Sequence, residues 1–254
     1  MQLQLSPRNS LKTPIRIVAV LLVSSIGTLA GAQQSDELRG NPDAIKLAKS
    51  LVETMGGGAI WSELRSVHFV HEWDLANRSE RYVENEILDL TGPRSYVTME
   101  SETYSRVRAY SPENRYWNIV NGEFAYTDQS SFENAMERAP YSLYRLARAI
   151  ARADQRFELQ LGEIPGIPGI EAIQFNDAEG IPRGWIAVNL RNEPILWATT
   201  QYVYTLGPLK RFGNLYVPNW ATAHNGLVRY EMISLSGSNQ PPDPSLFAAP
   251  EDNE

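Results

Sequence analysis

The sequence predicts a mainly β protein with helices: a curved antiparallel sheet, or incomplete β-barrel, of about 10 or 11 strands, with an N-terminal helix and one internal helix. Between residues 67 and 235, short runs rich in Tyr, Val, Trp and Thr show the two-residue alternation of strands. Turn residues such as Gly92-Pro93 and Asn121-Gly122 separate these runs, and the connections are too short for crossover helices. Because a sheet of 10 or 11 strands rarely stays flat, we expect this one to curl.

The first 32 residues have the order of a secretory signal. A segment with three positive residues precedes an apolar run at 17–29, and Ala30-Gly31-Ala32 follows as a small-residue cleavage site. The apolar run falls short of the roughly 20 residues that a membrane-spanning helix needs. We therefore expect residues 1–32 to be a signal peptide that is removed after Ala32, and the mature protein to act in the periplasm.

The absence of Cys narrows the chemistry of this exported chain. It excludes disulfides, thiol catalysis and Cys-based zinc sites. It also excludes an N-terminal lipid anchor, because position 32 is Ala where a lipidated Cys would stand. Removal of the signal leaves 222 residues with 20 Lys and Arg against 30 Asp and Glu, a surface that repels nucleic acid.

The N-terminal helix follows a short linker at 33–43. Pro42 and Asp43 suit a first helical turn, apolar residues at three- and four-residue spacings follow, and Gly56-Gly57-Gly58 ends the pattern. Trp61 and Leu64, in a short helical turn, are expected to be buried. The curved-sheet domain is predicted over residues 44–236 and the remainder, 237–254, as an extended, mostly disordered tail in which Leu246-Phe247 is the candidate for docking.

Eleven runs carry the strand pattern: 67–75, 81–90, 94–101, 103–110, 116–120, 156–161, 169–175, 185–190, 195–206, 215–223 and 227–235. The internal helix interrupts them between 131 and 153, with Pro140 placed in its first turn. Leu143, Tyr144, Leu146, Ala147 and Ile150 form its apolar stripe, and Arg145, Arg148 and Arg152 form a basic face opposite.

Histidines and acidic pairs are the candidates for chemistry. His68 and His71 are three residues apart, which puts them on opposite faces of a strand and makes a shared metal ion improbable. His71 is in phase with Phe69 and Trp73, so we interpret it as a core or cavity-wall residue that makes one hydrogen bond. No Gly-x-Ser-x-Gly or phosphate-binding glycine motif occurs.

Two acidic pairs, Glu84 with Glu86 and Glu100 with Glu102, share strand faces. Such pairs could serve general acid–base catalysis, but in a chain with 30 acidic residues we interpret them as solvated strand faces. The sequence thus predicts no catalytic residue, no cofactor and no metal. Aromatic residues make up 10% of the chain and either fill the core or line a cavity on the concave face of the sheet.

The order of elements resembles the outer-membrane lipoprotein-sorting proteins, the LolA/LolB-like periplasmic carriers. The resemblance covers about residues 44–248. Its motifs are Ala48-x-x-Leu51 to Gly56-Gly57 with Trp61 and Leu64, Leu209-Lys210-Arg211-Phe212-Gly213, and Pro242-Asp243-Pro244-Ser245-Leu246-Phe247. It implies an incomplete barrel with a helical lid, whose apolar interior shelters the acyl chains of a lipoprotein or lipid.

The leading hypothesis is therefore a monomeric periplasmic carrier or binding protein for an acylated or apolar ligand. Its expected ligand-binding residues are Phe69, His71 and Trp73 on the sheet, with Leu143, Leu146 and Ile150 on the lid helix. One alternative is an envelope sensor or assembly partner that uses the same fold to bind proteins of the envelope membranes. Another is a hydrolase that acts on envelope lipid or glycan through the pairs at 84, 86, 100 and 102.

Overall fold

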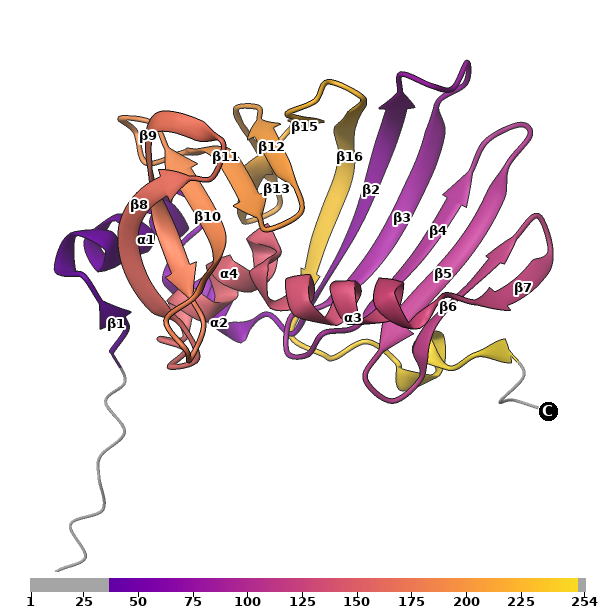
Figure 1. Cartoon of the computed structure of the whole chain (residues 1–254), viewed down its shortest axis with the longest axis horizontal. Coiled ribbons are helices and arrows are strands. Elements are labelled where there is room, and N and C mark those ends of the chain that lie inside the picture. Colours follow the sequence, from indigo (N-terminus) through magenta and orange to yellow (C-terminus); the bar gives the residue numbers. More distant parts are fainter. Residues whose placement is uncertain (1–36, 251–254) are drawn as a thin grey trace, which may run out of the picture. The chain divides into compact units, whose positions relative to one another are not determined.

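The computed structural model describes residues 37–250, and within them one large curved sheet dominates (Figure 1). Fourteen strands of this part of the chain form the sheet, which does not close on itself, and two more form a small separate sheet. Neighbouring strands run antiparallel, apart from the first, which pairs with β8 in parallel. The predicted fold class is confirmed, with more strands than expected. The signal peptide predicted at 1–32 lies outside the described residues.

The strands fall into two halves that face each other across the concave side. In spatial order, the first half consists of β16 (Val228–Ser238), β2 (Ser66–Leu75), β3 (Tyr82–Asp89), β4 (Ser95–Glu100), β5 (Ser105–Ser111), β6 (Arg115–Val120) and β7 (Glu123–Tyr126). The second consists of β1 (Arg39–Gly40), β8 (Glu158–Ile164), β9 (Ile167–Asn176), β10 (Pro182–Val188), β11 (Pro194–Thr199), β12 (Val203–Leu206) and β15 (Trp220–Ala223). The small sheet pairs β13 (Leu209–Phe212) with β14 (Leu215–Pro218).

Two of the predicted strands are each divided in the structure. The run at 195–206 becomes β11 and β12, because the Thr199 hydroxyl accepts hydrogen bonds from the backbone N–H groups of Gln201 and Tyr202 and stabilises a turn. The run at 215–223 becomes β14 and β15, which belong to different sheets. Strands β1, β7 and β13 were not predicted, since two to four residues show too little alternation.

Helix α1 (Pro42–Thr54) begins and ends as its sequence predicts. The Asn41 side chain accepts hydrogen bonds from the backbone N–H groups of Asp43 and Ala44, so it caps the helix. Gly56 and Gly57, with φ of 121° and 99°, end it in a backbone conformation that other residues rarely adopt. Strand β1, within the expected linker at 33–43, already pairs with β8.

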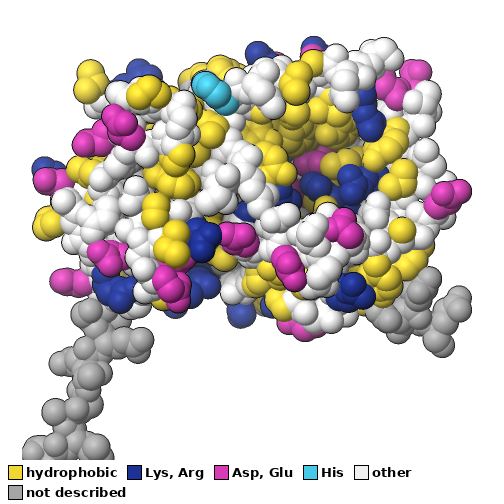
Figure 2. All heavy atoms as spheres, viewed as in Figure 1, with side chains coloured by type: hydrophobic (Ala, Val, Ile, Leu, Met, Phe, Trp, Pro, Cys, Tyr) yellow, Lys and Arg dark blue, Asp and Glu magenta, His cyan; other side chains and the backbone are white. Residues whose placement is uncertain are grey.

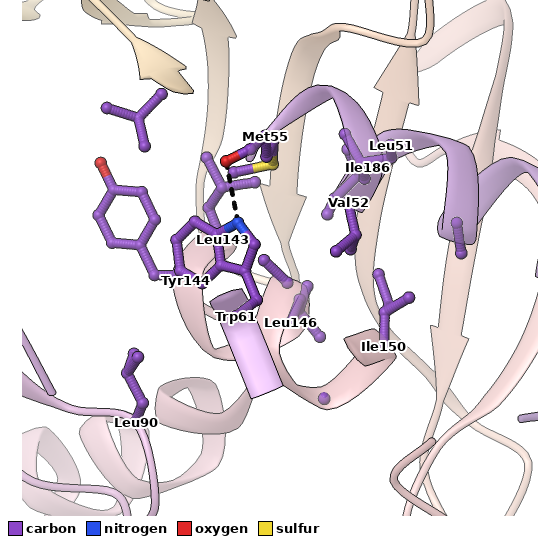
Figure 3. Close-up of a cluster of buried hydrophobic side chains, with 14 of the residues drawn as sticks. Leu51, Val52, Met55, Trp61, Leu90, Leu143, Tyr144, Leu146, Ile150 and Ile186 are labelled. Carbon is purple, nitrogen blue, oxygen red and sulfur yellow. Dashed lines mark hydrogen bonds between the residues drawn. The ribbon is translucent and has the colours of Figure 1, made fainter. Parts of the chain in front are cut away.

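The core lies where α1, α2 (Gly58–Glu63) and α4 (Leu143–Ala151) pack together inside the second half of the sheet (Figure 3). Trp61 is fully buried there, and its indole N–H donates to the Met55 carbonyl oxygen at 3.0 Å. Leu146 and Ile150 of α4 point into the same cluster. The expected burial of Trp61 and Leu64 is confirmed.

The single internal helix predicted between 131 and 153 is wrong. The segment forms α3 (Gln129–Arg138), a 3₁₀ turn η1 (Ala139–Tyr141) and α4. Pro140 has no backbone N–H to continue the α3 hydrogen-bond pattern and lies in η1, and Ser142, whose backbone is extended with ψ of 146°, separates η1 from α4. Helix α4 fills the core, whereas α3 lies across the concave side near β5 and β6 (Figure 1). The segment placed like a lid is therefore α3, not the helix that carries Leu146 and Ile150.

The C-terminal segment is also more ordered than predicted up to residue 250. Strand β16 continues to Ser238, and η2 (Pro244–Phe247) packs against β4 and β5. Phe247 is buried, and its carbonyl oxygen accepts a hydrogen bond from the Trp117 indole at 2.9 Å. Only the docking of Phe247 matches the expectation for this tail.

Candidate functional site

The concave side of the sheet holds an open cavity of about 440 Å³. Figure 2 looks into this hollow, where hydrophobic side chains form the wall and charged side chains lie deeper inside. Strands β16, β2, β3, β4 and β5 contribute alternate residues, as the two-residue period of a strand requires, and β11, β12 and the α3–α4 segment line the opposite side. The concave face is therefore partly hollow, and the aromatic residues do not all serve the core.

Aromatic rings form a continuous wall of this cavity. His71 stacks on Tyr230 with ring centroids 4.0 Å apart, and Trp73 lies nearly parallel to Tyr82 at 6.1 Å. Across the cavity, Trp197 stacks on Tyr204 at 5.6 Å. Rings of this kind present flat, weakly hydrated surfaces on which an apolar chain can lie.

The structure brings four of the six predicted ligand-binding residues to this cavity. Phe69, His71 and Trp73 of β2 line it, and so does Leu143 at the start of α4. Leu146 and Ile150 do not, because they lie one and two turns further along α4, inside the core cluster. Their assignment to a ligand-facing lid is wrong, since the helix that carries them is packed on several sides.

A polar zone occupies the part of the cavity formed by β3, β4 and β5. Across β3, β4 and β5, Glu84 lies opposite Met99, which in turn lies opposite Arg106. In the same way Glu86 lies opposite Val97, and Val97 lies opposite Arg108. All four charged residues line the cavity. An Arg108 guanidinium nitrogen lies 3.7 Å from Glu84 Oε2, and the Ser95 hydroxyl donates to Glu86 Oε1 at 2.7 Å. We refer to Glu84, Glu86, Arg106 and Arg108 as the polar zone.

This zone corrects the interpretation of the first acidic pair as a solvated strand face. Glu84 is only 2% exposed, and Glu86 is half-buried beside it. Glu84 and Glu86 do share one face of their strand, as predicted. That face is the concave one, and the opposite half of the sheet lies over it. Glu100 and Glu102 are exposed, as expected.

Burial changes the protonation of the groups at the centre of the cavity. It raises the pKa of the Glu84 carboxyl to about 7, and the attraction of Arg108 offsets only part of that effect. Burial also lowers the pKa of His71 to about 3. His71 Nδ1 is 4.0 Å from Glu84 Oε1, so near neutral pH this contact joins a neutral imidazole to a partly protonated carboxyl group rather than two full charges.

Several buried polar atoms of the cavity wall have no hydrogen-bond partner. They are both ring nitrogens of His71, Nε of Arg106 and Oγ of Ser142. The hydrogen bond expected for His71 is therefore absent. Buried polar groups are usually paired, and an unpaired one costs on the order of 1–3 kcal/mol, so a cluster of them in one cavity is typical of a ligand site.

Two of the three arginines of the predicted basic face, Arg145 and Arg148, bond to the backbone of neighbouring segments, whereas Arg152 is exposed. Arg145 is 6% exposed, and its guanidinium donates to the carbonyl oxygens of Asp89, Ala139 and Arg94 at 2.7 to 2.8 Å. Arg148 donates to the Leu64 carbonyl oxygen at 2.6 Å. Arg145 forms part of the cavity wall. Two of its bonds tie α4 to the β3–β4 connection, and the third ties α4 to η1.

Sequence reasoning missed Arg106 and Arg108. Both occur in β5, where Arg106, Arg108 and Tyr110 alternate with Val107 and Ala109. Such a pattern ordinarily indicates a solvated polar face, and only the position of β5 beside β3 and β4 turns that face inward. The spacing of two residues was the available signal, but it does not distinguish a solvated face from a cavity.

Within residues 37–250, no group of three or more His, Cys, Asp and Glu side chains is placed to hold a metal ion. None of the helices in this range is long and apolar enough to cross a membrane.

No protein-family model and no curated protein matches the sequence. Among solved structures, the chain is similar to a DUF1329 family protein from Desulfovibrio piger, with a TM-score of 0.43 and 8% identity over 77% of this chain and 93% of that one. It is also similar to MucB, with a TM-score of 0.23 and 13% identity over 83% of this chain and 64% of MucB. The MucA/MucB complex of Pseudomonas aeruginosa gives a TM-score of 0.25 and 12% identity over 83% of this chain and 62% of that one. At these scores, none of the three likenesses assigns the chain to a family.

Proposed function

We propose that the protein is an exported binding protein that shelters an apolar or acylated ligand in the cavity of its curved sheet. The observation that carries the proposal is the cavity itself. Its volume of about 440 Å³ lies within the range of roughly 300–1,000 Å³ that small-molecule sites occupy. Moving one methylene of an acyl chain from water into such a cavity is favourable by about 0.8 kcal/mol, so even part of a chain supplies useful affinity.

The position of the cavity supports a carrier role. It opens between two halves of one sheet, so a ligand can enter without the core being unpacked. Helix α3 is the segment placed to cover the ligand, because its contacts reach both halves of the sheet. It packs against β5 and β6 of the first half, and Asn134 accepts a hydrogen bond from Gln201 between β11 and β12 of the second. Residues 1–32 have the order of a signal peptide, which puts this function in the periplasm after cleavage at Ala32.

The proposal requires binding without turnover and assigns no catalytic residue, cofactor or metal. It names the acyl chain of a lipid or lipoprotein as the ligand and a monomer as the working form. Envelope membrane proteins are the partners that would load or receive the ligand, and nucleic acid is not a partner.

Uptake of an environment-sensitive naphthylamine dye by the mature protein tests the proposal. We expect saturable fluorescence enhancement, and displacement of the dye by alkyl alcohols that improves as the chain lengthens. The variant Leu143→Trp fills the cavity from the start of α4 and should weaken dye binding. Leu227→Trp, at a position that is 56% exposed, is the matched control and should not.

A folded protein, shown by an unchanged circular dichroism spectrum, that takes up no dye and no alcohol would contradict the proposal. If the same protein instead captured an envelope protein in a stable complex, the sensor or assembly-partner hypothesis would replace it.

A further inference from the structure

The cavity as a whole, with Arg138 added to the polar zone, has an excess of positive charge. Arg106, Arg108 and, from α3, Arg138 all line the cavity, whereas its acidic side chains are Glu84 and Glu86. Because burial raises the pKa of Glu84 to about 7, that carboxyl carries only part of a negative charge near neutral pH. The whole chain has a net charge of −7, so a positively charged interior runs against its overall composition. Such a local excess favours an anion in the cavity.

The donors of this zone are not used up by contacts within the protein. Arg106 has no ion pair among the described residues, and its Nε has no hydrogen-bond partner although the atom is buried. Glu86 already accepts the Ser95 hydroxyl. Arginine presents a planar set of N–H groups that matches a carboxylate or phosphate in two-pronged geometry. A bound anion would therefore satisfy donors that the folded chain leaves unpaired.

The apolar part of the cavity begins directly beside this zone. Phe69 is the register partner of Glu86 across β2 and β3, and its ring lies 4.8 Å from that of His71. Leu143, Tyr144 and Leu206 continue the apolar lining. A ligand that contacts both parts at once must be amphiphilic. The volume of about 440 Å³ lies in the lower part of the range for ligand cavities, which favours one chain over a two-chain lipid.

We propose that the cavity selects a single-chain amphiphile with an anionic headgroup, which Arg106 and Arg108 bind while the chain lies against Phe69 and Leu143. This inference rests on the proposed function and adds the chemistry of the headgroup. A cationic headgroup would face uncompensated guanidinium groups, and a neutral alcohol would leave the Arg106 donor without a charged partner.

Four ligands with the same twelve-carbon chain test the inference: dodecanoate, dodecyl phosphate, dodecanol and dodecyltrimethylammonium. Each competes with the naphthylamine dye on the mature protein below its micelle-forming concentration, at pH 7 and low salt. One charged hydrogen bond corresponds to roughly 10- to 100-fold in affinity, so we expect both anions to bind at least tenfold more tightly than dodecanol. The ammonium compound should bind most weakly of the four.

The variant Arg106→Gln should reduce this preference for anions to a few-fold and leave the affinity for dodecanol unchanged, whereas Arg106→Lys should retain part of it. Arg229→Gln is the matched control. Arg229 lies on β16 between two cavity-lining residues, but its exposed side chain bonds to Glu231 outside the cavity, so the anion preference should persist.

Equal binding of dodecanol and both anions by the unmodified protein would overturn the headgroup assignment and leave the proposed function intact. An unaltered anion preference in a folded Arg106→Gln protein would also overturn it. If none of the four ligands binds, the proposed function itself fails, and the inference fails with it.

Discussion

Replacing Glu84 by Gln should change how the stability of the protein depends on pH. The carboxyl group is almost completely buried, and its pKa is raised from 4.5 to about 7 in the folded protein. Folding therefore favours the protonated form. Its contribution to stability is fully present below pH 4.5, decreases as the pH rises through about 7, and then stays constant. Glutamine has nearly the same shape and does not titrate.

The size of the effect follows from the pKa shift. A shift of one unit corresponds to about 1.4 kcal/mol, so the raised pKa corresponds to on the order of 3 kcal/mol. Relative to the unmodified protein, Glu84→Gln should gain about that much unfolding free energy between pH 4.5 and pH 8. His71 does not disturb the comparison. Its pKa is lowered to about 3 by burial, so it stays neutral in both folded proteins over most of this window.

Urea unfolding of both proteins at several pH values from 4.5 to 8, followed by circular dichroism, measures the difference. Glu100→Gln is the control, because that side chain is exposed on the neighbouring strand β4 and should show a difference that does not vary with pH. A constant difference between Glu84→Gln and the unmodified protein across the whole range would refute the claim that Glu84 is buried in its neutral form.

Three further predictions concern the walls of the cavity and the C-terminal segment. Dodecanoate affinity should fall several-fold between pH 6 and pH 8.5 in a dye-competition assay. Over this range Glu84 becomes negatively charged among Glu86, Arg106, Arg108 and His71, and it then repels the carboxylate of the ligand. An affinity that rises with pH would contradict this prediction. Arg145→Met should lower the unfolding free energy by about 3–5 kcal/mol, because it leaves three carbonyl oxygens without their charged donor. The control Arg152→Met removes one exposed hydrogen bond and should cost less than about 1 kcal/mol. Equal losses of the two variants in urea unfolding would contradict this prediction. Phe247→Ala should cost about 3–5 kcal/mol in the same assay, and Leu246→Ala clearly less, since Phe247 is buried in the cluster around Trp117 whereas Leu246 is half-buried outside it. A tail that contributes nothing to stability would show no loss in either variant.

Local patterns predicted the parts of this fold that depend on local physics. Asn121-Gly122 has positive φ at both residues, 49° and 88°, and joins β6 to β7 in the tight hairpin that such a pair favours. Pro42, Asp43 and the glycines after Met55 correctly predicted where α1 begins and ends. The alternation of Phe69, His71 and Trp73 placed them correctly on one face.

The features that sequence reasoning missed depend on contacts between distant segments. The apolar stripe of α4 looked like a ligand-facing lid, because periodicity does not show that α1 and α2 cover Leu146. Glu84 was interpreted as solvated and Arg108 was missed, because only the pairing of β3, β4 and β5 and the curl of the sheet place them inside a cavity. Long-range arrangement of this kind leaves no period in the sequence.

The proposed function depends on an apolar chain lying inside the cavity of the curved sheet. Of the six tryptophans in the chain, Trp73 and Trp197 line that cavity. A bromine-labelled dodecanoate quenches tryptophan fluorescence on contact, so titration of the mature protein measures where the chain lies. We predict saturable quenching that is largely lost in the Trp73→Phe, Trp197→Phe double variant, while dye displacement shows that the ligand still binds. Undiminished quenching in that variant would place the chain elsewhere and contradict the claim.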